Sequence, residues 1–180
     1  NSEELVVLSN RKIMKEKSKK RVAVINTAQV VIVLGSKSDL PVIEGMYPLL
    51  DRFGLSYSVE VASAHRQPDK LKRIIKASEK GGTEIFVAAA GMAAHLPGVM
   101  ASLTAKPVIG IPVAAGPMAG IDALLSIVQM PPGVPVATVA IGSAGARNAA
   151  CLAARILALK DPKVAEAVDN YRNYLAKGGK

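Results

Sequence analysis

The sequence predicts an α/β fold of three layers (αβα), in which a parallel sheet lies between helices on both of its faces. Apolar, β-branched runs recur along the chain, and segments with helical periodicity alternate with them. Continuous apolar runs suit strands that are buried on both faces, and alternation of strands with helices favours a parallel sheet. Half of the 180 residues are hydrophobic, so one domain with a sizeable core is expected.

The elements are expected in the following order. Five strands are predicted at Val30–Leu34, Tyr57–Val61, Ile85–Ala90, Pro107–Val113 and Val136–Ile141, where apolar runs are continuous. Helices are predicted between and after them at Leu40–Phe53, Asp69–Lys80, Leu96–Leu103, a region near Ile121–Gln129, Ala146–Leu159 and Lys163–Ala176. The start of the last helix is indicated by Asp161-Pro162, because proline is favoured at the first helical position.

The segment before the first strand is basic. Residues 1–29 contain seven Lys or Arg and three acidic residues, within a chain of net charge +9. Blocks of like charge are usually disordered, so residues 1–29 are expected to form a partly disordered extension and residues 30–180 the single domain. A nucleic-acid-binding arm at Arg11–Arg21 is the alternative, and Val22–Ile25 would suit an additional irregular strand.

Composition excludes several classes of protein. Aromatic residues make up 3% of the chain and tryptophan is absent, which excludes a nucleic-acid reader built on stacking. The single cysteine, Cys151, excludes a disulfide framework and a multi-cysteine metal site, and it fits a reducing cytoplasm. No apolar stretch of about 18 residues occurs and no signal-peptide pattern is present, so no membrane association is expected.

The candidate site lies where the first three strands end, because ligands of open α/β sheets bind at the carboxyl ends of the strands. Gly35-Ser36-Lys37-Ser38-Asp39 follows the first strand and places hydroxyls and a carboxylate at a helix start. Such a position favours an anion such as phosphate, although Ser and Asp are equally good helix caps. The sequence alone leaves both interpretations open.

Two further loops carry the only two histidines of the chain. Ser63–Pro68 follows the second strand and contains His65 beside Arg66, a residue type that holds phosphate in a bidentate manner. Gly91–Gly98 follows the third strand, and its small residues allow a ligand to approach the backbone closely. Tight packing of a helix on the sheet would also explain the small residues, and His95 would then be structural.

Together the three loops resemble the signature loops of the PurE family of purine biosynthesis. The resemblance covers about residues 30–174 and includes the later segments Ser126–Pro131 and Pro135–Ile141. It implies a flavodoxin-like sheet, a phosphorylated aminoimidazole riboside as substrate, and no cofactor or metal. The implied substrate-binding residues are Ser36, Ser38, Asp39, Ser63, Ala64, Arg66, Gly91, Ala93, Ala94, His95 and Leu96.

The resemblance also implies the activity. Arg66 and His95 are typical of class I members, which convert N5-carboxyaminoimidazole ribonucleotide (N5-CAIR) to 4-carboxyaminoimidazole ribonucleotide (CAIR). His65 is expected to transfer the protons, since an imidazole titrates near neutral pH, and His95 is expected to shape the pocket. Gln67 and Met92 depart from the family pattern, where Thr and Gly are usual. A homo-octamer with sites shared between subunits is also implied.

Three alternatives stay open at this point. A class II member would carboxylate aminoimidazole ribonucleotide (AIR) with CO2 directly. A PurE-like carboxylase of another cofactor pathway would have a different second loop. A flavodoxin-like module could sense a nucleotide without catalysis.

Overall fold

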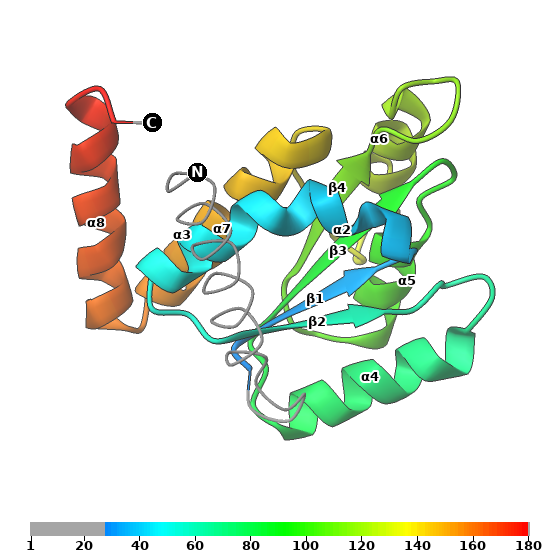
Figure 1. Ribbon diagram of the computed structural model, residues 1–180. Helices are drawn as coiled ribbons and strands as arrows, with labels where there is room; N and C mark the ends of the chain where they lie inside the picture. The colour runs from blue at the N-terminus through cyan, green and yellow to red at the C-terminus, as the bar shows by residue number, and fades with distance from the viewer. Residues whose placement is uncertain (1–27, 180) are drawn as a thin grey trace, which may run out of the picture.

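The computed structural model describes residues 28–179, which form an α/β unit around one parallel sheet (Figure 1). The five strands are β1 (Val30–Leu34), β2 (Tyr57–Val61), β3 (Ile85–Gly91), β4 (Val108–Val113) and β5 (Ala137–Thr138). Their order in the sheet is β2-β1-β3-β4-β5, and every neighbouring pair is parallel. The chain therefore reverses its direction of winding between β1 and β3, which is the point where flavodoxin-like sheets bind ligands.

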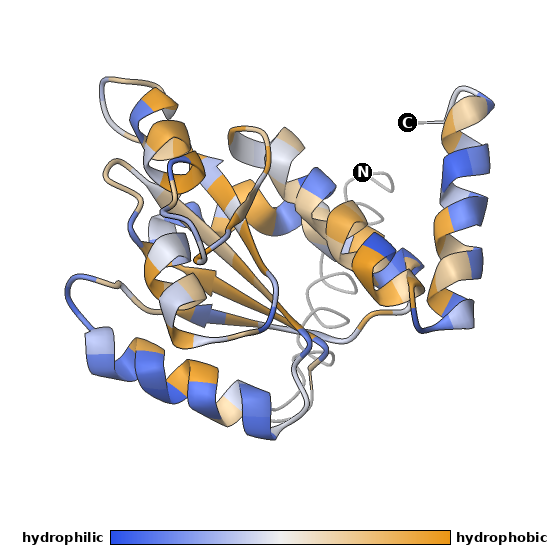
Figure 2. Cartoon of the chain, turned by 180° about the vertical axis from the view of Figure 1, so that it is seen from behind, coloured by the Kyte–Doolittle hydropathy of each residue, from blue (hydrophilic) through white to orange (hydrophobic). Residues whose placement is uncertain are grey.

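Helices cover both faces of the sheet, so the predicted three-layer fold is confirmed. The longer helices are α4 (Pro68–Lys80), α5 (Leu96–Leu103), α6 (Ile121–Val128), α7 (Gly142–Ala158) and α8 (Pro162–Ala176). Between β1 and β2 lie the short helices η1 (Lys37–Asp39), α2 (Leu40–Ile43), η2 (Glu44–Met46) and α3 (Tyr47–Arg52). Hydrophobic residues are concentrated on the strands, whereas α4 and α8 carry many hydrophilic ones (Figure 2).

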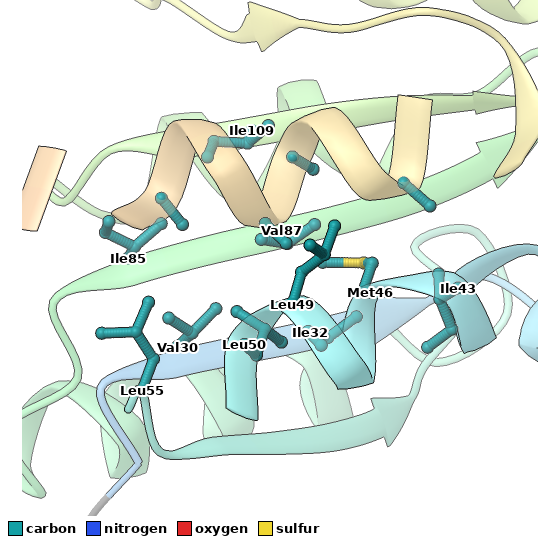
Figure 3. Close-up of a cluster of buried hydrophobic side chains, with 14 of the residues drawn as sticks. Val30, Ile32, Ile43, Met46, Leu49, Leu50, Leu55, Ile85, Val87 and Ile109 are labelled. Carbon is teal, nitrogen blue, oxygen red and sulfur yellow. The ribbon is translucent and has the colours of Figure 1, made fainter. Parts of the chain in front are cut away.

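Strand β1 divides the core in two because its side chains alternate between the faces of the sheet. Ile32 and its same-face neighbours pack under α2, α3 and α7, whereas Val31 and Val33 pack under α4, α5 and α6. Figure 3 shows part of the first cluster, where Ile32 and Val87 lie close to Met46 and Leu50. All five β1 residues are fully buried, as the continuous apolar run predicts.

The predicted single helix Leu40–Phe53 is wrong, because the structure divides it into α2, η2 and α3. Pro41 and Pro48 each lie in the first turn of a new α-helix. Proline lacks the N–H that would continue the helical hydrogen bonds, so the preceding turn tightens to 3-10 geometry. Hydrophobic periodicity alone does not reveal this division, because it depends on the two prolines.

Two further elements differ from the prediction by three residues or more at one end. Strand β5 contains only Ala137 and Thr138 of the expected Val136–Ile141, since it is an edge strand with a single partner, β4. Helix α7 begins at Gly142 rather than Ala146. Gly145 permits this early start, because a Cβ atom there would lie 2.6 Å from the carbonyl carbon of Ala140 and closer still to its oxygen. Glycine has low helix propensity, so sequence reasoning starts the helix after it.

Helix α8 begins at Pro162, as Asp161-Pro162 predicts, and lies against α7 and α3. Asp161 Oδ1 accepts hydrogen bonds from the backbone N–H groups of Lys163 (2.9 Å) and Val164 (3.4 Å). The Arg52 guanidinium carbon lies 5.0 Å and 4.5 Å from the ring centroids of Tyr171 and Tyr174, which are cation–π contacts. The helix extends beyond the sheet in Figure 1, and Val164 is its one buried residue.

The predicted basic extension lies, except for Ala28 and Gln29, outside the described residues, and so does the irregular strand at Val22–Ile25. Within residues 28–179, no helix is long and apolar enough to cross a membrane.

Candidate active site

The order of the strands brings the three predicted loops together. Strand β1 lies between β2 and β3, so all three strands end at the same edge of the sheet. Gly35 N–H donates to the carbonyl oxygen of Ala89 on β3 (3.1 Å), and Ala62 N–H donates to that of Leu34 on β1 (2.9 Å). The loops that continue from these residues therefore start side by side, as the sequence predicts.

The first loop is held by its own side chains. Ser36 and Asp39 form a capping box around η1, in which the Ser36 N–H donates to Asp39 Oδ2 at 3.0 Å. Ser36 Oγ accepts from the Ser38 N–H (3.3 Å) and from the Ser38 hydroxyl (2.8 Å). The cap predicted for this loop is therefore present. Ser36 Oγ is the acceptor in both of these bonds, so neither of them uses its own hydroxyl hydrogen.

Asp39 is the buried acid of this loop, with 8% of its surface exposed. Burial raises the pKa of its carboxyl group, while hydrogen bonds from the Ser36 backbone and the Ser38 side chain act in the opposite direction. A carboxylate that is buried at a real electrostatic cost, next to a candidate ligand site, is typical of a group retained for binding.

Replacement of Asp39 by asparagine is expected to increase stability at neutral pH and to weaken ligand binding about tenfold. The pKa of Asp39 is higher in the folded protein than the value of 3.8 in the unfolded chain. The protonated carboxyl group therefore contributes to stability below pH 3.8, and this contribution is lost as the pH rises through the folded-state pKa. Asparagine keeps an acceptor for the Ser36 N–H and never ionises. Thermal unfolding of both proteins should be measured from below pH 3.8 up to neutral pH. The difference in stability in favour of the Asp39→Asn variant should grow as the pH rises. A difference that is independent of pH would contradict the assigned cost of burial.

The second loop presents His65 and Arg66 on the surface of the molecule. Both side chains are exposed, and Arg66 Nε and its backbone N–H donate to Ser63 Oγ at 3.4 and 3.3 Å. Ser63 therefore positions Arg66, and within residues 28–179 the terminal guanidinium nitrogens make no hydrogen bond. Gln67 is the N-cap of α4 but makes no capping bond with its side chain. Threonine, which is usual at this position, has a hydroxyl that suits a cap.

The third loop is strained at two residues. Met92 and Ala94 have φ values of +55° and +37°, in the left-handed region that favours glycine. Gly91 has no room for a side chain, because a Cβ atom there would lie 2.7 Å from Ala115 Cβ. The Ala94 N–H donates back to the Gly91 carbonyl (3.1 Å), so the loop turns sharply and exposes Ala93 and His95.

Met92→Gly is expected to stabilise the fold by about 1 kcal/mol, because it removes the cost of a left-handed conformation for a residue with a Cβ atom. Met92→Ala keeps the Cβ atom and serves as the matched control for loss of the longer side chain. Chemical denaturation of the three proteins measures the difference. Equal stabilities for the Gly and Ala variants would show that the loop carries no such cost.

Two predicted site residues contribute backbone rather than side chains. Ala94 and Leu96 are 4% and 2% exposed, and both pack in the core cluster beneath α4, α5 and α6. Gly91 and Ala64 are partly exposed at the edge of the sheet. The predicted contacts of Ala94 and Leu96 with substrate are therefore limited to their peptide groups.

The two histidines meet across the site. His65 Nε2 lies 2.5 Å from His95 Nδ1, and the rings are nearly perpendicular, with centroids 4.7 Å apart. Sequence reasoning treats the two residues separately and misses this contact. One feature of the sequence could have indicated the contact, namely the equal distance of the two histidines from their strands. His65 lies four residues after the end of β2 at Val61, and His95 lies four residues after the end of β3 at Gly91.

Groups that would hold a metal are absent from the described part of the chain, since no three His, Cys, Asp or Glu residues cluster there. The arrangement instead combines an imidazole pair, a buried carboxylate, an arginine and a serine hydroxyl. Such a set is typical of an α/β protein that binds an anionic small molecule and transfers protons at the carboxyl edge of its sheet.

Comparison with known proteins identifies the family. The family model described as AIR carboxylase matches residues 29–177, so the chain belongs to the AIR carboxylase family. It is 48% identical over 149 residues to the N5-carboxyaminoimidazole ribonucleotide mutase of Thermotoga maritima, covering 83% of this chain and 86% of that one. It is 50% identical over 146 residues to the enzyme of the same name from Pseudomonas aeruginosa, covering 81% and 90%.

Solved structures support the fold. The crystal structure of Treponema denticola PurE matches with a TM-score of 0.76 and 30% sequence identity, covering 83% of this chain and 92% of that one. The predicted family and the predicted flavodoxin-like fold are therefore both confirmed.

Proposed function

We propose that this protein is an N5-CAIR mutase of purine biosynthesis, an isomerase that moves the carboxylate of N5-CAIR from the exocyclic nitrogen N5 to carbon C4. The observation that carries the proposal is the meeting of His65 with His95 beside the loops of Ser36 and Arg66. Relatives that bear this name share about half of their residues with the chain over most of its length.

The substrate is a phosphorylated aminoimidazole riboside, and the three loops offer groups suited to each part of it. The Ser36 hydroxyl and the Arg66 guanidinium bind the phosphate, since hydroxyl and guanidinium hydrogens are strong donors to phosphate oxygens. Asp39 accepts hydrogen bonds from the ribose hydroxyls. Ser38 supports the loop through its bond to Ser36. The backbone of Gly91, Ala93 and Ala94 lies against the aminoimidazole ring, where small residues permit close approach.

The reaction requires two proton transfers. The bond between N5 and the carboxyl carbon breaks, CO2 is released within the pocket and N5 receives a proton, which gives AIR. The electron-rich C4 then forms a bond to CO2 and loses its proton, which restores the aromatic ring. His65 starts the cycle with hydrogen on both ring nitrogens, donates one of them to N5 and later accepts the proton from C4, so it ends the cycle in the state in which it began. The loop Gly91–Gly98 helps to retain CO2 between the two steps.

A paired assay tests the proposal. Purified protein is supplied with N5-CAIR, or with AIR and bicarbonate, and the formation of CAIR is followed. We expect turnover of N5-CAIR to be much the faster. Equal efficiency with AIR and ambient bicarbonate would instead favour a class II carboxylase. Absence of both reactions would favour a carboxylase of another cofactor pathway or a non-catalytic nucleotide-binding module.

Arg66→Ala is expected to weaken binding of CAIR about 10- to 100-fold, because a charged hydrogen bond to phosphate is worth roughly 1.5–3 kcal/mol. Arg155→Ala is the matched control. Arg155 is exposed in the last turn of α7, so its replacement removes the same charge far from the carboxyl edge of the sheet. Isothermal titration calorimetry measures both affinities. Equal affinities in the two variants would remove Arg66 from the site.

We also propose that the protein assembles into a homo-octamer in the cytoplasm, with sites completed by neighbouring subunits. Support comes from large apolar side chains that the single chain leaves exposed, on or just before α6 and in or next to α8: Met118, Ile121, Leu125, Val128, Leu159, Tyr174 and Leu175. Exposed apolar side chains that lie on one helix favour association with another subunit. Light scattering after gel filtration measures the mass of the assembly.

A further inference from the structure

The contact between the two imidazoles determines which of their nitrogens carry hydrogen. His65 Nε2 and His95 Nδ1 are 2.5 Å apart, a distance that requires one hydrogen between them. Two bare nitrogens would repel each other through their lone pairs, and two N–H groups would clash. One ring is therefore the donor and the other the acceptor, and the tautomers of the two neutral rings depend on each other.

Each ring has one nitrogen left that points away from this contact. Within residues 28–179, no hydrogen bond joins His65 Nδ1 or His95 Nε2 to another group. If His65 donates, its Nδ1 is bare and basic, and His95 carries its hydrogen on Nε2. If His95 donates, the two roles are exchanged. The neutral pair therefore always presents one base and one N–H donor at the site.

The proposed function selects the first arrangement. It assigns the proton transfers to His65, so the free nitrogen of that ring, Nδ1, must be bare when it accepts the proton from C4. His65 Nε2 then carries the hydrogen of the contact and His95 Nδ1 accepts it. His95 is the N-cap residue of α5, and its carbonyl accepts from the Val99 N–H at 2.9 Å, so the helix fixes its backbone.

We propose that His95 is a positioning residue that holds His65 in its Nε2–H tautomer and so leaves Nδ1 as the base, while His95 Nε2–H becomes a donor for the migrating carboxylate. The proposal rests on the proposed mutase function. In the second proton transfer, the C4–H bond breaks, its electron pair returns to the substrate ring, and the proton forms a bond to His65 Nδ1. The hydrogen bond from His65 Nε2 to His95 is kept throughout.

Two replacements of His95 separate positioning from packing. Asparagine places an amide oxygen near the position of Nδ1 and retains an acceptor, whereas phenylalanine retains the ring shape without any nitrogen. We expect His95→Asn to keep kcat within about tenfold of the parent and His95→Phe to lose on the order of 10²-fold. The reverse order, with Phe close to the parent and Asn impaired, would show that His95 only fills space and would overturn the proposal.

Nuclear magnetic resonance of protein labelled with ¹⁵N-histidine tests the tautomers without any turnover. The chain has only two histidines, so four ring-nitrogen signals are expected, and either His65→Asn or His95→Phe assigns them. The proposal requires hydrogen on Nε2 of both rings when the pair is neutral. A neutral His65 that carries its hydrogen on Nδ1 and none on Nε2 would overturn it. These tautomers are measured whether or not N5-CAIR is turned over, so failure of the proposed function and failure of the positioning role give different results.

Discussion

His65→Asn is expected to lower kcat for N5-CAIR by about 10²- to 10⁴-fold, the usual contribution of general acid–base catalysis. Asparagine fills a similar volume and can still accept a hydrogen bond, but it neither binds nor releases a proton near neutral pH. His65 is exposed in a loop and contributes nothing to either core cluster, so the fold should be retained. The expected result is a well-folded protein that binds ligand and hardly turns it over.

Single-turnover rates and the affinity for CAIR should be measured together. A loss of rate with little change in affinity indicates a group that acts on the reacting atoms. His95→Asn is the matched control, since it makes the same substitution on the partner ring and keeps an acceptor. If His65→Asn turned over at near the parent rate while His95→Asn were folded and inactive, the roles of the two histidines would be exchanged.

Gly145→Ala is expected to destabilise the protein by more than about 4 kcal/mol, which is a large part of the stability of an ordinary domain. The added Cβ atom would lie 2.6 Å from the Ala140 carbonyl carbon and would overlap the carbonyl oxygen. Both are backbone atoms, so no side-chain rotation relieves the overlap. The first turn of α7 would have to move away from the segment that follows β5.

Gly98→Ala provides the control for this prediction. Gly98 also lies within a helix, so both substitutions gain similar helix propensity, about 1 kcal/mol. The Cβ atom at Gly98 would lie 3.1 Å from the Met130 sulfur, which is near the end of a flexible side chain. Its stability should therefore change by less than about 1 kcal/mol. Chemical denaturation of both variants measures the difference, and similar midpoints for the two would contradict the steric argument.

The parts of the fold that depend on local patterns were predictable from the sequence. Strands β1 and β2 have the predicted bounds, and β3 extends one residue beyond its prediction, because each is a continuous apolar run bounded by turns. The early start of α7 was not predictable in the same way. It depends on how close the backbone at Gly145 comes to Ala140, and this approach exists only in the folded chain.

The candidate site likewise has features that the local sequence predicts and features that depend on the folded chain. That Ser36, His65 and His95 follow strand ends is visible in the sequence, and parallel strands must end at one edge. The contact between the two histidines depends on the order of the strands, since β1 separates β2 from β3 in the sheet. The burial of Asp39 likewise depends on how its loop closes over the strand ends. The hydrophobic periodicity of the chain specifies neither the contact nor the burial.

The order of strands in the sheet also has a consequence for the synthesis of the protein. Strands β1, β2 and β3 leave the ribosome before β4, and the loops that follow these three strands are those of the proposed site. Strand β3 then has one edge paired with β1 and the other edge bare until β4 emerges. Its sequence from Ile85 to Ala90 is wholly apolar, and such an unpaired edge is prone to join other chains. The nascent chain is therefore most exposed to aggregation after its chemical groups are complete and before residues 108–113 cover that edge.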